Sequence, residues 1–491
     1  MKSIAKMVLL IISLCVLMTF NAVAEEKSKL QAFPSEITLG DGPITINRAV
    51  DIAISNSRTV KESQFDLESA RRKVDETKNQ FGFNVTAKGY AIQSHAQSEL
   101  KMPYTTYTVG AATSTVGVYT NPLTGATSQT QWYAITNPYP NIDYFTFNLN
   151  KEWSHSSELD VTKPLITFGK KKDAIKAASG QMGMSKLDVQ ISELDLVENV
   201  KKAFYDVLLA QEFVKVQEEA VRQAQTHFDA AKSKFEVGAS PKFDVIRAEV
   251  EVASAKENLT SAKKGLDLAK MFLSNTIGLP VSNEIDIAEE GAYEKIDLKN
   301  AEYYTDIAMN NRPELEKIKI AKDVARASRR LSENKPTVAF SWSWSFYNKG
   351  GGISSSEHTW NGVIAAEVPV FDNGLAKAKV DQAARLHDKL GLNEIDAKEG
   401  ITLEVKQAYL GLIEASQRID TSVAVLASAD EGYRMADVGF KEGVTTSIDL
   451  LDAEHGLTQA KLNRAKASFD YETQKARLAR ACGFKSMADM K

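Results

Sequence analysis

The second half of this 491-residue chain repeats its first half, and this repeat constrains the fold more than any other feature of the sequence. Residues 164–250 align with residues 369–455 at one constant offset of 205, without a gap. Matching pairs include Pro164 with Pro369, Gly169 with Gly374, Gly238 with Gly443, and Asp244 with Asp449. Identities in one fixed register indicate a duplicated structural unit, because similar composition alone would not keep the register.

The first copy carries an insertion that the second copy lacks. Its early part matches the second copy at an offset of 255, which pairs Asn56 with Asn311. The two offsets differ by 255 − 205 = 50 residues. Residues 102–142 contain no Asp, Glu, Lys or Arg. We therefore expect a strand hairpin at residues 83–160 with a long insertion at residues 93–142.

The N-terminus predicts export from the cytoplasm. Lys2 and Lys6 precede an apolar run from Met7 to Phe20, and small residues at 22–24 suit a signal peptidase. We interpret residues 1–24 as a signal peptide. A membrane anchor is the alternative, but the 14 apolar residues are fewer than a spanning helix needs.

Charge and cysteine content limit the partners and the source of stability. The net charge of −4 and the lack of a basic stripe argue against a nucleic-acid partner. Removal of the signal peptide would leave Cys482 as a single cysteine, so no intrachain disulfide is expected. Stability must then come from packing and assembly.

Each copy contains a long segment with a seven-residue apolar repeat. Such a period predicts helices that supercoil around each other, and a second series of small residues, three places further on, allows close approach. An ordinary helical bundle remains an alternative at this point. The two apolar series are Val200, Val207, Val214, Val221, Phe228 and Phe235, and Val405, Leu412, Ile419, Leu426, Tyr433 and Phe440.

Each long helix is expected to end at a glycine and to return as a shorter helix. Gly238 and Gly443 mark these turns, which gives helical hairpins at residues 169–278 and 373–482. Ser240 followed by Pro241 is a typical start of the returning helix, and Thr445 takes the same place in the second copy.

Between the helices, aromatic and small polar residues alternate. This pattern is typical of strands with one face on lipid and the other on water, although a soluble β-sandwich also produces it. We expect the lipid-facing residues to be Phe145, Phe147, Phe340, Trp342, Trp344 and Phe346.

Weaker partner strands near residues 83–92 and 360–370 would give two hairpins, the second at residues 337–370. Four strands cannot enclose a lumen, and an open sheet edge is not tolerated in lipid. A membrane barrel would therefore need several chains. The insertion would project on the extracellular side, as a longer barrel wall, a lid over the pore or a surface loop.

With its duplicated unit of strands and long helices, the sequence resembles the TolC family of outer-membrane channel proteins. The resemblance covers nearly the whole chain after residue 24. It depends on the duplicated unit together with the segments Ile44–Ala53, Gly278–Pro280, Phe235–Val245 and Phe440–Ala453.

The resemblance implies a mixed α and β membrane protein of the Gram-negative outer membrane. Three identical chains would form a twelve-stranded β-barrel and a long α-helical periplasmic barrel, each chain contributing four strands. The first repeat would span residues 25–281 and the second residues 299–491, with residues 282–298 in a belt around the helices. The assembly would be a passive duct that docks onto a periplasmic adaptor and an inner-membrane pump.

The resemblance also places functional residues at the hairpin tips. Asp449 and Asp452 match acidic positions that line the pore constriction, where close carboxylates attract cations. An acidic residue in the first turn of a helix also offsets the helix dipole, and Asp244 matches Asp449 in the other copy. The tip residues expected to contact the adaptor are Gly238, Ala239, Gly443 and Val444, although a tight turn alone explains the glycines.

Arg247 occupies the position that Asp452 has in the other copy. We therefore expect Arg247 to neutralise an aspartate of a neighbouring hairpin as a gate latch, with Asp244 as a second member. The chain departs from the family's closing contacts at Phe440, where a tyrosine is common, and at Thr445, where a basic residue occurs.

The sequence predicts no enzymatic site. We expect no catalytic residues, no cofactor and no metal ligands. The six histidines are scattered without metal-ligand spacing, and Gly169 with its three following lysines lacks the rest of a phosphate-binding loop. Small-molecule efflux is the leading function. The alternatives are the duct of a type I protein secretion system and a soluble periplasmic coiled-coil scaffold.

Overall fold

The computed structural model describes residues 42–93, 99–109, 114–120, 127–128, 141–148, 153–281, 285–288, 295–349 and 355–489. The predicted signal peptide and part of the insertion lie outside these residues. The chain divides into two compact units. The sheet unit comprises residues 63–189 and 314–398, and the hairpin unit comprises residues 1–62, 190–313 and 399–491.

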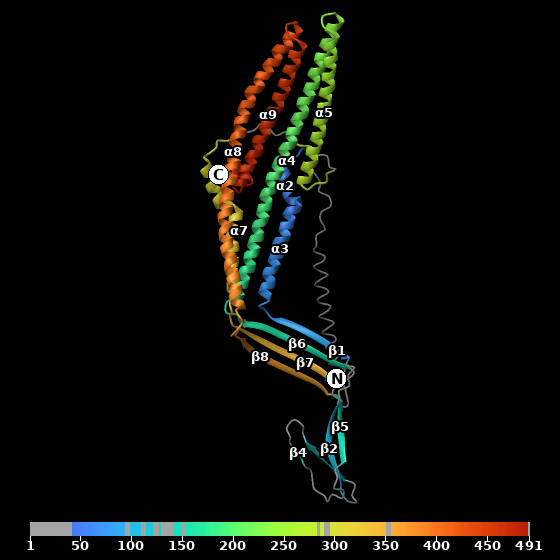
Figure 1. The fold of residues 1–491 in the computed structure, drawn as a ribbon, viewed down its shortest axis with the longest axis vertical. Helices are drawn as coiled ribbons and strands as arrows, with labels where there is room; N and C mark the ends of the chain where they lie inside the picture. Colours follow the sequence, from blue (N-terminus) through green and yellow to red (C-terminus); the bar gives the residue numbers. More distant parts are fainter. Residues whose placement is uncertain are drawn as a thin grey trace. The chain divides into compact units, whose positions relative to one another are not determined.

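The sheet unit contains a four-stranded antiparallel sheet in the order β1-β6-β7-β8 (Figure 1). The central pair β6–β7 joins the two copies, since β6 belongs to the first repeat and β7 to the second. The strands are β1 (Asn84–Gln93), β6 (Trp153–Ile166), β7 (Thr337–Lys349) and β8 (Ser355–Glu367).

The two faces of this sheet differ in chemistry. Trp344 lies opposite Leu159 of β6 and Trp360 of β8, so large apolar side chains share one face. On the other face the Lys88 Nζ lies 2.7 Å from the Asp160 carboxylate. The alternation at residues 340–346 therefore does correspond to a strand with one apolar face, β7.

The insertion forms a second sheet, in the order β4-β3-β2-β5. The prediction that Phe145 and Phe147 lie on the returning strand of the first hairpin is wrong, because their strand β5 pairs with β2, and β1 pairs with β6. The described parts of the insertion are thus not a structureless loop. The strands are β2 (Glu99–Val109), β3 (Ser114–Thr120), β4 (Thr127–Ser128) and β5 (Asn141–Asn148).

Phe145 itself is 58% exposed, and its ring meets Tyr104 of β2 edge-on at a centroid distance of 6.3 Å. The side chain of Phe147 lies outside the described residues. Apolar and polar residues alternate in both β5 and β6. The polar positions of β6 include the charged residues Glu158 and Asp160, so its pattern was harder to identify as a membrane strand.

In the sheet unit, α3 (Arg58–Asn79) and α7 (Pro313–Leu331) accompany the first parts of α4 (Lys170–Glu236) and α8 (Leu375–Lys441). Charged pairs connect α7 to both long helices. Arg330 Nε lies 2.7 Å from Asp173 of α4, and Lys322 Nζ lies 2.6 Å from Glu394 of α8. Hydrogen bonds from Lys322 and Lys398 lower the pKa of Glu394 to about 2.

The hairpin unit contains the remainder of α4 with α5 (Lys242–Thr276), and the remainder of α8 with α9 (Ser447–Ala481). Several heptad residues belong to its core, since Val200, Val207, Val405 and Leu412 are fully buried. This confirms the coiled-coil interpretation of the apolar repeat. None of the described helices has both the length and the apolar composition needed to cross a membrane.

Two short helices, α2 (Ile46–Asn56) and α6 (Ala301–Asn311), meet the far ends of the hairpins in matching ways. Gly278 after α5 and Gly483 after α9 adopt φ angles of 77° and 86°. A Cβ atom would lie 3.1 Å from the Asn56 carbonyl oxygen at Gly278, and 3.1 Å from the Asn311 carbonyl oxygen at Gly483. Both the backbone angle and the close approach therefore require glycine.

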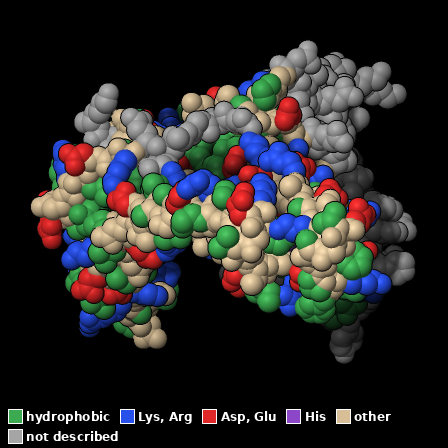
Figure 2. Space-filling view, turned by 90° about the horizontal axis from the view of Figure 1, so that it is seen from above, with side chains coloured by type: hydrophobic (Ala, Val, Ile, Leu, Met, Phe, Trp, Pro, Cys, Tyr) green, Lys and Arg blue, Asp and Glu red, His purple; other side chains and the backbone are tan. Residues whose placement is uncertain are grey.

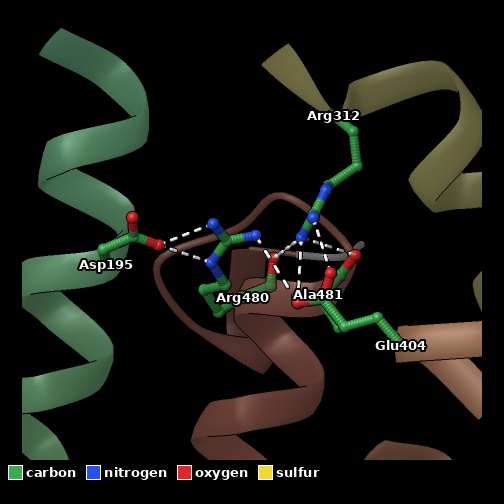
Figure 3. A network of polar contacts seen from close by, with 5 residues as sticks. All are labelled: Asp195, Arg312, Glu404, Arg480 and Ala481. Atoms are coloured by element: carbon green, nitrogen blue, oxygen red, sulfur yellow. Dashed lines mark hydrogen bonds and ion pairs between the residues drawn. The ribbon is translucent and has the colours of Figure 1, made fainter. Parts of the chain in front are cut away.

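A polar network in the hairpin unit adds to these contacts (Figure 3). Arg312 forms a paired contact with Glu404 of α8, the shorter distance being 2.7 Å, and also donates to the carbonyls of Arg480 and Ala481. Arg480 in turn donates from Nε to Asp195 of α4 at 2.7 Å. The network therefore links α4, α8 and the end of α9.

Candidate functional site at the hairpin tips

The two hairpin tips have the same backbone structure. Gly238 and Gly443 both have a φ of 76°, a value that favours glycine. Ala239 donates its N–H to the Lys234 carbonyl at 2.8 Å, and Val444 donates to the Gly439 carbonyl at 2.7 Å. These bonds, which span five residues, are the mark of a Schellman motif. Helix termination alone thus explains both glycines.

The returning helices begin differently from the prediction. In the first copy the N-cap position is Pro241, which makes no side-chain cap bond, and the Ser240 hydroxyl lies 2.7 Å from Asp244 Oδ2. In the second copy the N-cap is Thr446. The expectation of N-caps at Ser240 and Thr445 is therefore wrong by one residue.

Asp449 is part of a capping box at the start of α9. Its N–H donates to Thr446 Oγ1 at 3.2 Å, and the Thr446 N–H donates to Asp449 Oδ2 at 3.0 Å. Hydrogen bonds from the Thr446 side chain and then its backbone hold the pKa of Asp449 below its usual value. Capping of α9 within one chain is therefore enough to explain an aspartate at position 449. Asp452 lies about one turn further along and is exposed.

The proposed latch residues do not meet within one chain. The Arg247 guanidinium lies 4.9 Å from the centre of the Phe243 ring, a cation–π contact inside α5. Within the described part of the chain, Arg247 forms no ion pair with an aspartate. Within the single chain, Arg247 therefore contacts a ring of its own helix.

A group of residues that no sequence pattern predicted connects α4 to the second tip. Phe440 is nearly buried, with the Lys234 ammonium 4.0 Å from its ring centre and the His227 ring edge-on at 5.0 Å. His227 Nε2 lies 3.2 Å from the hydroxyl of Ser447, the first residue of α9. Burial lowers the pKa of His227, which favours its neutral form. The one sequence feature that could have indicated this contact is the large apolar residue Phe440 next to the second turn.

Both tips expose apolar side chains. Val237 beside the first turn is 79% exposed and Val444 in the second turn is 82% exposed, and Phe243 and Ile448 follow on the returning helices. Gly238 and Ala239 are exposed as well. Apolar residues that are gathered at a protruding turn are typical of a surface that binds another protein.

The described residues contain no group of three His, Cys, Asp or Glu that could hold a metal ion. Cys482 is buried, and burial raises its pKa to about 12, so this thiol is unreactive. Figure 2 shows basic and acidic side chains interspersed over the face that it draws, without an extended basic region.

A duplicated unit with long helical hairpins and a strand sheet is the architecture of outer-membrane channel proteins. A sequence model of the family described as "Outer membrane efflux protein" matches residues 49–279 and 305–484, so the chain belongs to this family. Members are channel proteins of the Gram-negative outer membrane that extend into the periplasm, and not enzymes. The predicted resemblance and localisation are thereby confirmed.

Known relatives agree with this assignment. The alkaline protease secretion protein AprF of Pseudomonas aeruginosa is 25% identical, over 69% of this chain and 71% of that protein. Outer membrane protein TolC of Vibrio cholerae is 23% identical, over 70% of this chain and 82% of that protein. Alignments with four of the curated relatives span 66% to 82% of their lengths. The crystal structure of CusC superimposes with a TM-score of 0.70 at 16% identity, covering 92% of this chain and 97% of that one.

Proposed function

We propose that this protein is a passive outer-membrane duct for the efflux of small molecules, built from three copies of the chain. It would serve a periplasmic adaptor and an inner-membrane pump as the last part of a tripartite export system. The observation that carries the proposal is the β1-β6-β7-β8 sheet, which has one apolar face and one polar face.

The order of the strands suits closure with further copies. β1 and β8 are the two edges of this sheet, and an even number of antiparallel strands makes them run in opposite directions. Joining β8 of one copy to β1 of the next would therefore continue the antiparallel pairing. Apolar side chains would then face lipid, and Lys88 and Asp160 would face a water-filled lumen.

The hairpin tips would form the periplasmic end of the duct. Exposed Asp452 carboxylates from three copies would line a narrow entrance, and the apolar turns at Gly238–Ala239 and Gly443–Val444 would contact the adaptor. The Arg247 side chain would reach an aspartate of a neighbouring copy. These roles extend the family assignment to individual residues.

A charged residue on each face of β7 tests the sheet proposal. Trp344→Arg would place a charge on the lipid face and cost about 2–4 kcal/mol of barrel stability. Ser343→Arg, on the adjacent position, would place the same charge in the lumen and be tolerated. We expect the heat-resistant oligomer on gels to be lost only in Trp344→Arg. Equal behaviour of the two variants, or a monomer as the native species, would contradict the proposal.

Similarity to AprF favours protein secretion as a second candidate function, since that relative is described as a secretion protein. Deleting the gene in its own host separates the two. Efflux predicts greater susceptibility to toxic small molecules with an unchanged set of secreted proteins. Secretion predicts the loss of one protein from the medium with unchanged susceptibility.

A further inference from the structure

A polar groove lies between the two hairpins, in the hairpin unit. Its volume is about 470 Å³, and its polar lining includes Gln217, Glu251, Asn258, Glu454, His455 and Gln459. Glu454 of α9 is only 6% exposed, and its Oε1 is sealed from solvent without a hydrogen-bond partner among the described residues. Its counterpart in the first repeat, Glu249, is exposed. The duplication therefore does not account for a buried carboxyl group here.

The charged groups around Glu454 are mainly acidic. Glu251 faces it from α5, Asp437 and Tyr433 from α8, and Glu219 from α4 beyond Tyr433. The nearby cations already have partners. His455 Nε2 lies 3.4 Å from Glu251, and Lys461 Nζ lies 2.7 Å from Glu219. No described Lys, Arg or His forms an ion pair with Glu454.

An unpartnered buried carboxylate needs either a cation or a proton to be stable. Oε1 is sealed, so a cation in the groove could not contact both carboxylate oxygens without movement of the helices. The described residues also offer no cluster that would hold a metal ion. A proton needs no additional space. Burial, and then the charges of Glu251 and Asp437, raise the pKa of Glu454 to about 7.

We propose that Glu454 is a proton-operated lock between the hairpins. When its carboxyl group is protonated, α9 stays packed against α4 and α5, and when the group is ionised, the second hairpin is released from the first. His227 acts nearby on the same helix pair through Ser447, seven residues before Glu454 on the same face of α9. The consequence for transport, a duct entrance that loosens at alkaline pH, rests on the proposed function.

The direction of the pH effect follows from the two states of Glu454. In the packed state the pKa of Glu454 is about 7, whereas the released carboxyl group has the ordinary glutamate pKa of 4.5. The packed state is therefore fully favoured below about pH 4.5 and loses this advantage as the pH rises towards 7. Protonation of His227 acts in the opposite direction, because burial lowers its pKa.

Amide hydrogen exchange on the full-length protein tests the lock. Exchange of α9 amides near the tip is compared at pH 6 and pH 8.5, corrected for intrinsic rates, in the wild type and in Glu454→Gln. Gln mimics the protonated form, and His227 is present in both proteins, so its effect cancels. From pH 6 to pH 8.5, the equilibrium constant for opening of α9 should increase about tenfold more in the wild type than in Glu454→Gln. Glu249→Gln, the exposed counterpart, should behave like the wild type.

Infrared titration of the carboxyl band provides a second measurement. A band with a midpoint near pH 7 should disappear in Glu454→Gln and remain in Glu249→Gln. Glu251→Gln removes a neighbouring charge and should move the midpoint to lower pH, which keeps the test valid if Glu454→Gln does not fold. A midpoint near 4.5, or identical exchange in wild type and Glu454→Gln, overturns the lock. Neither readout needs conduction, so a protein that titrates but does not conduct would refute only the duct.

Discussion

Arg312 shows how one side chain can connect helices that are far apart in the sequence. Its side chain is only 5% exposed, and it bonds both to Glu404 and to two carbonyl groups at the end of α9. The carbonyls at a helix C-terminus lack partners within the helix, so a buried cation stabilises them. The repeat places Ser57 at the equivalent position of the first copy, so the interaction exists in one copy only.

Removing this arginine should destabilise the protein strongly. Arg312→Ala would leave Glu404 and the α9 carbonyls without their donor, at a cost of about 3 kcal/mol. Arg418→Ala is the matched control, because Arg418 is 48% exposed and pairs with Asp470 at the surface, so its loss should cost less than about 1 kcal/mol. Guanidinium-induced unfolding followed by helical circular dichroism would measure both. Similar midpoints for the two variants would show that the buried network adds nothing to stability.

The elements differ in how far the sequence predicts them. The period of seven predicts α4 and α8, because a heptad fixes both the helix and its buried face, as Val207 and Leu412 show. β7 was predictable because every second residue is large and apolar. The pairing of β5 was not, since alternation identifies a strand without identifying its neighbour. The buried environment of Glu454 was also hidden, because its repeat partner Glu249 has the same side chain and lies in water.

Two glycines in α4 test how closely α7 packs against it. A Cβ atom at Gly180 would overlap Val324 Cγ2, whereas a Cβ atom at Gly183 would lie 3.4 Å from Ile320 Cδ1. Valine in a helix cannot easily rotate away. Gly180→Ala should therefore destabilise the protein by about 1–3 kcal/mol.

Gly183→Ala is the control for this change and should be neutral or stabilising by up to about 1 kcal/mol, since alanine favours helix more than glycine does. Thermal unfolding would separate the two variants. Equal effects in the two would mean that helix propensity, and not the contact with Val324, decides the outcome.

At the scale of the whole molecule, the two copies share backbone features at their turns and differ in side chains near the tips. The tip turns are alike at Gly238 and Gly443, and the hairpin ends are alike at Gly278 and Gly483. The chemistry diverges where Asp452 replaces Arg247. A duplicated scaffold can thus supply a symmetric wall while one copy supplies the charges at the entrance.

This division predicts that the entrance charge depends on the second copy. Asp452 is exposed and completes no helix cap, so in the proposed assembly its carboxylates would be available to cations. Asp452→Asn should weaken block by divalent cations by up to about thirtyfold for each carboxylate that a bound ion contacts closely, since a doubly charged ion gains about 2 kcal/mol there. Asp449→Asn should have a smaller effect, because that carboxylate is turned back onto Thr446. Asp244→Asn, the first-copy counterpart held by Ser240, should leave the block unchanged. Single-channel recordings at a series of divalent concentrations would measure this order, and a block insensitive to Asp452→Asn would place the constriction elsewhere.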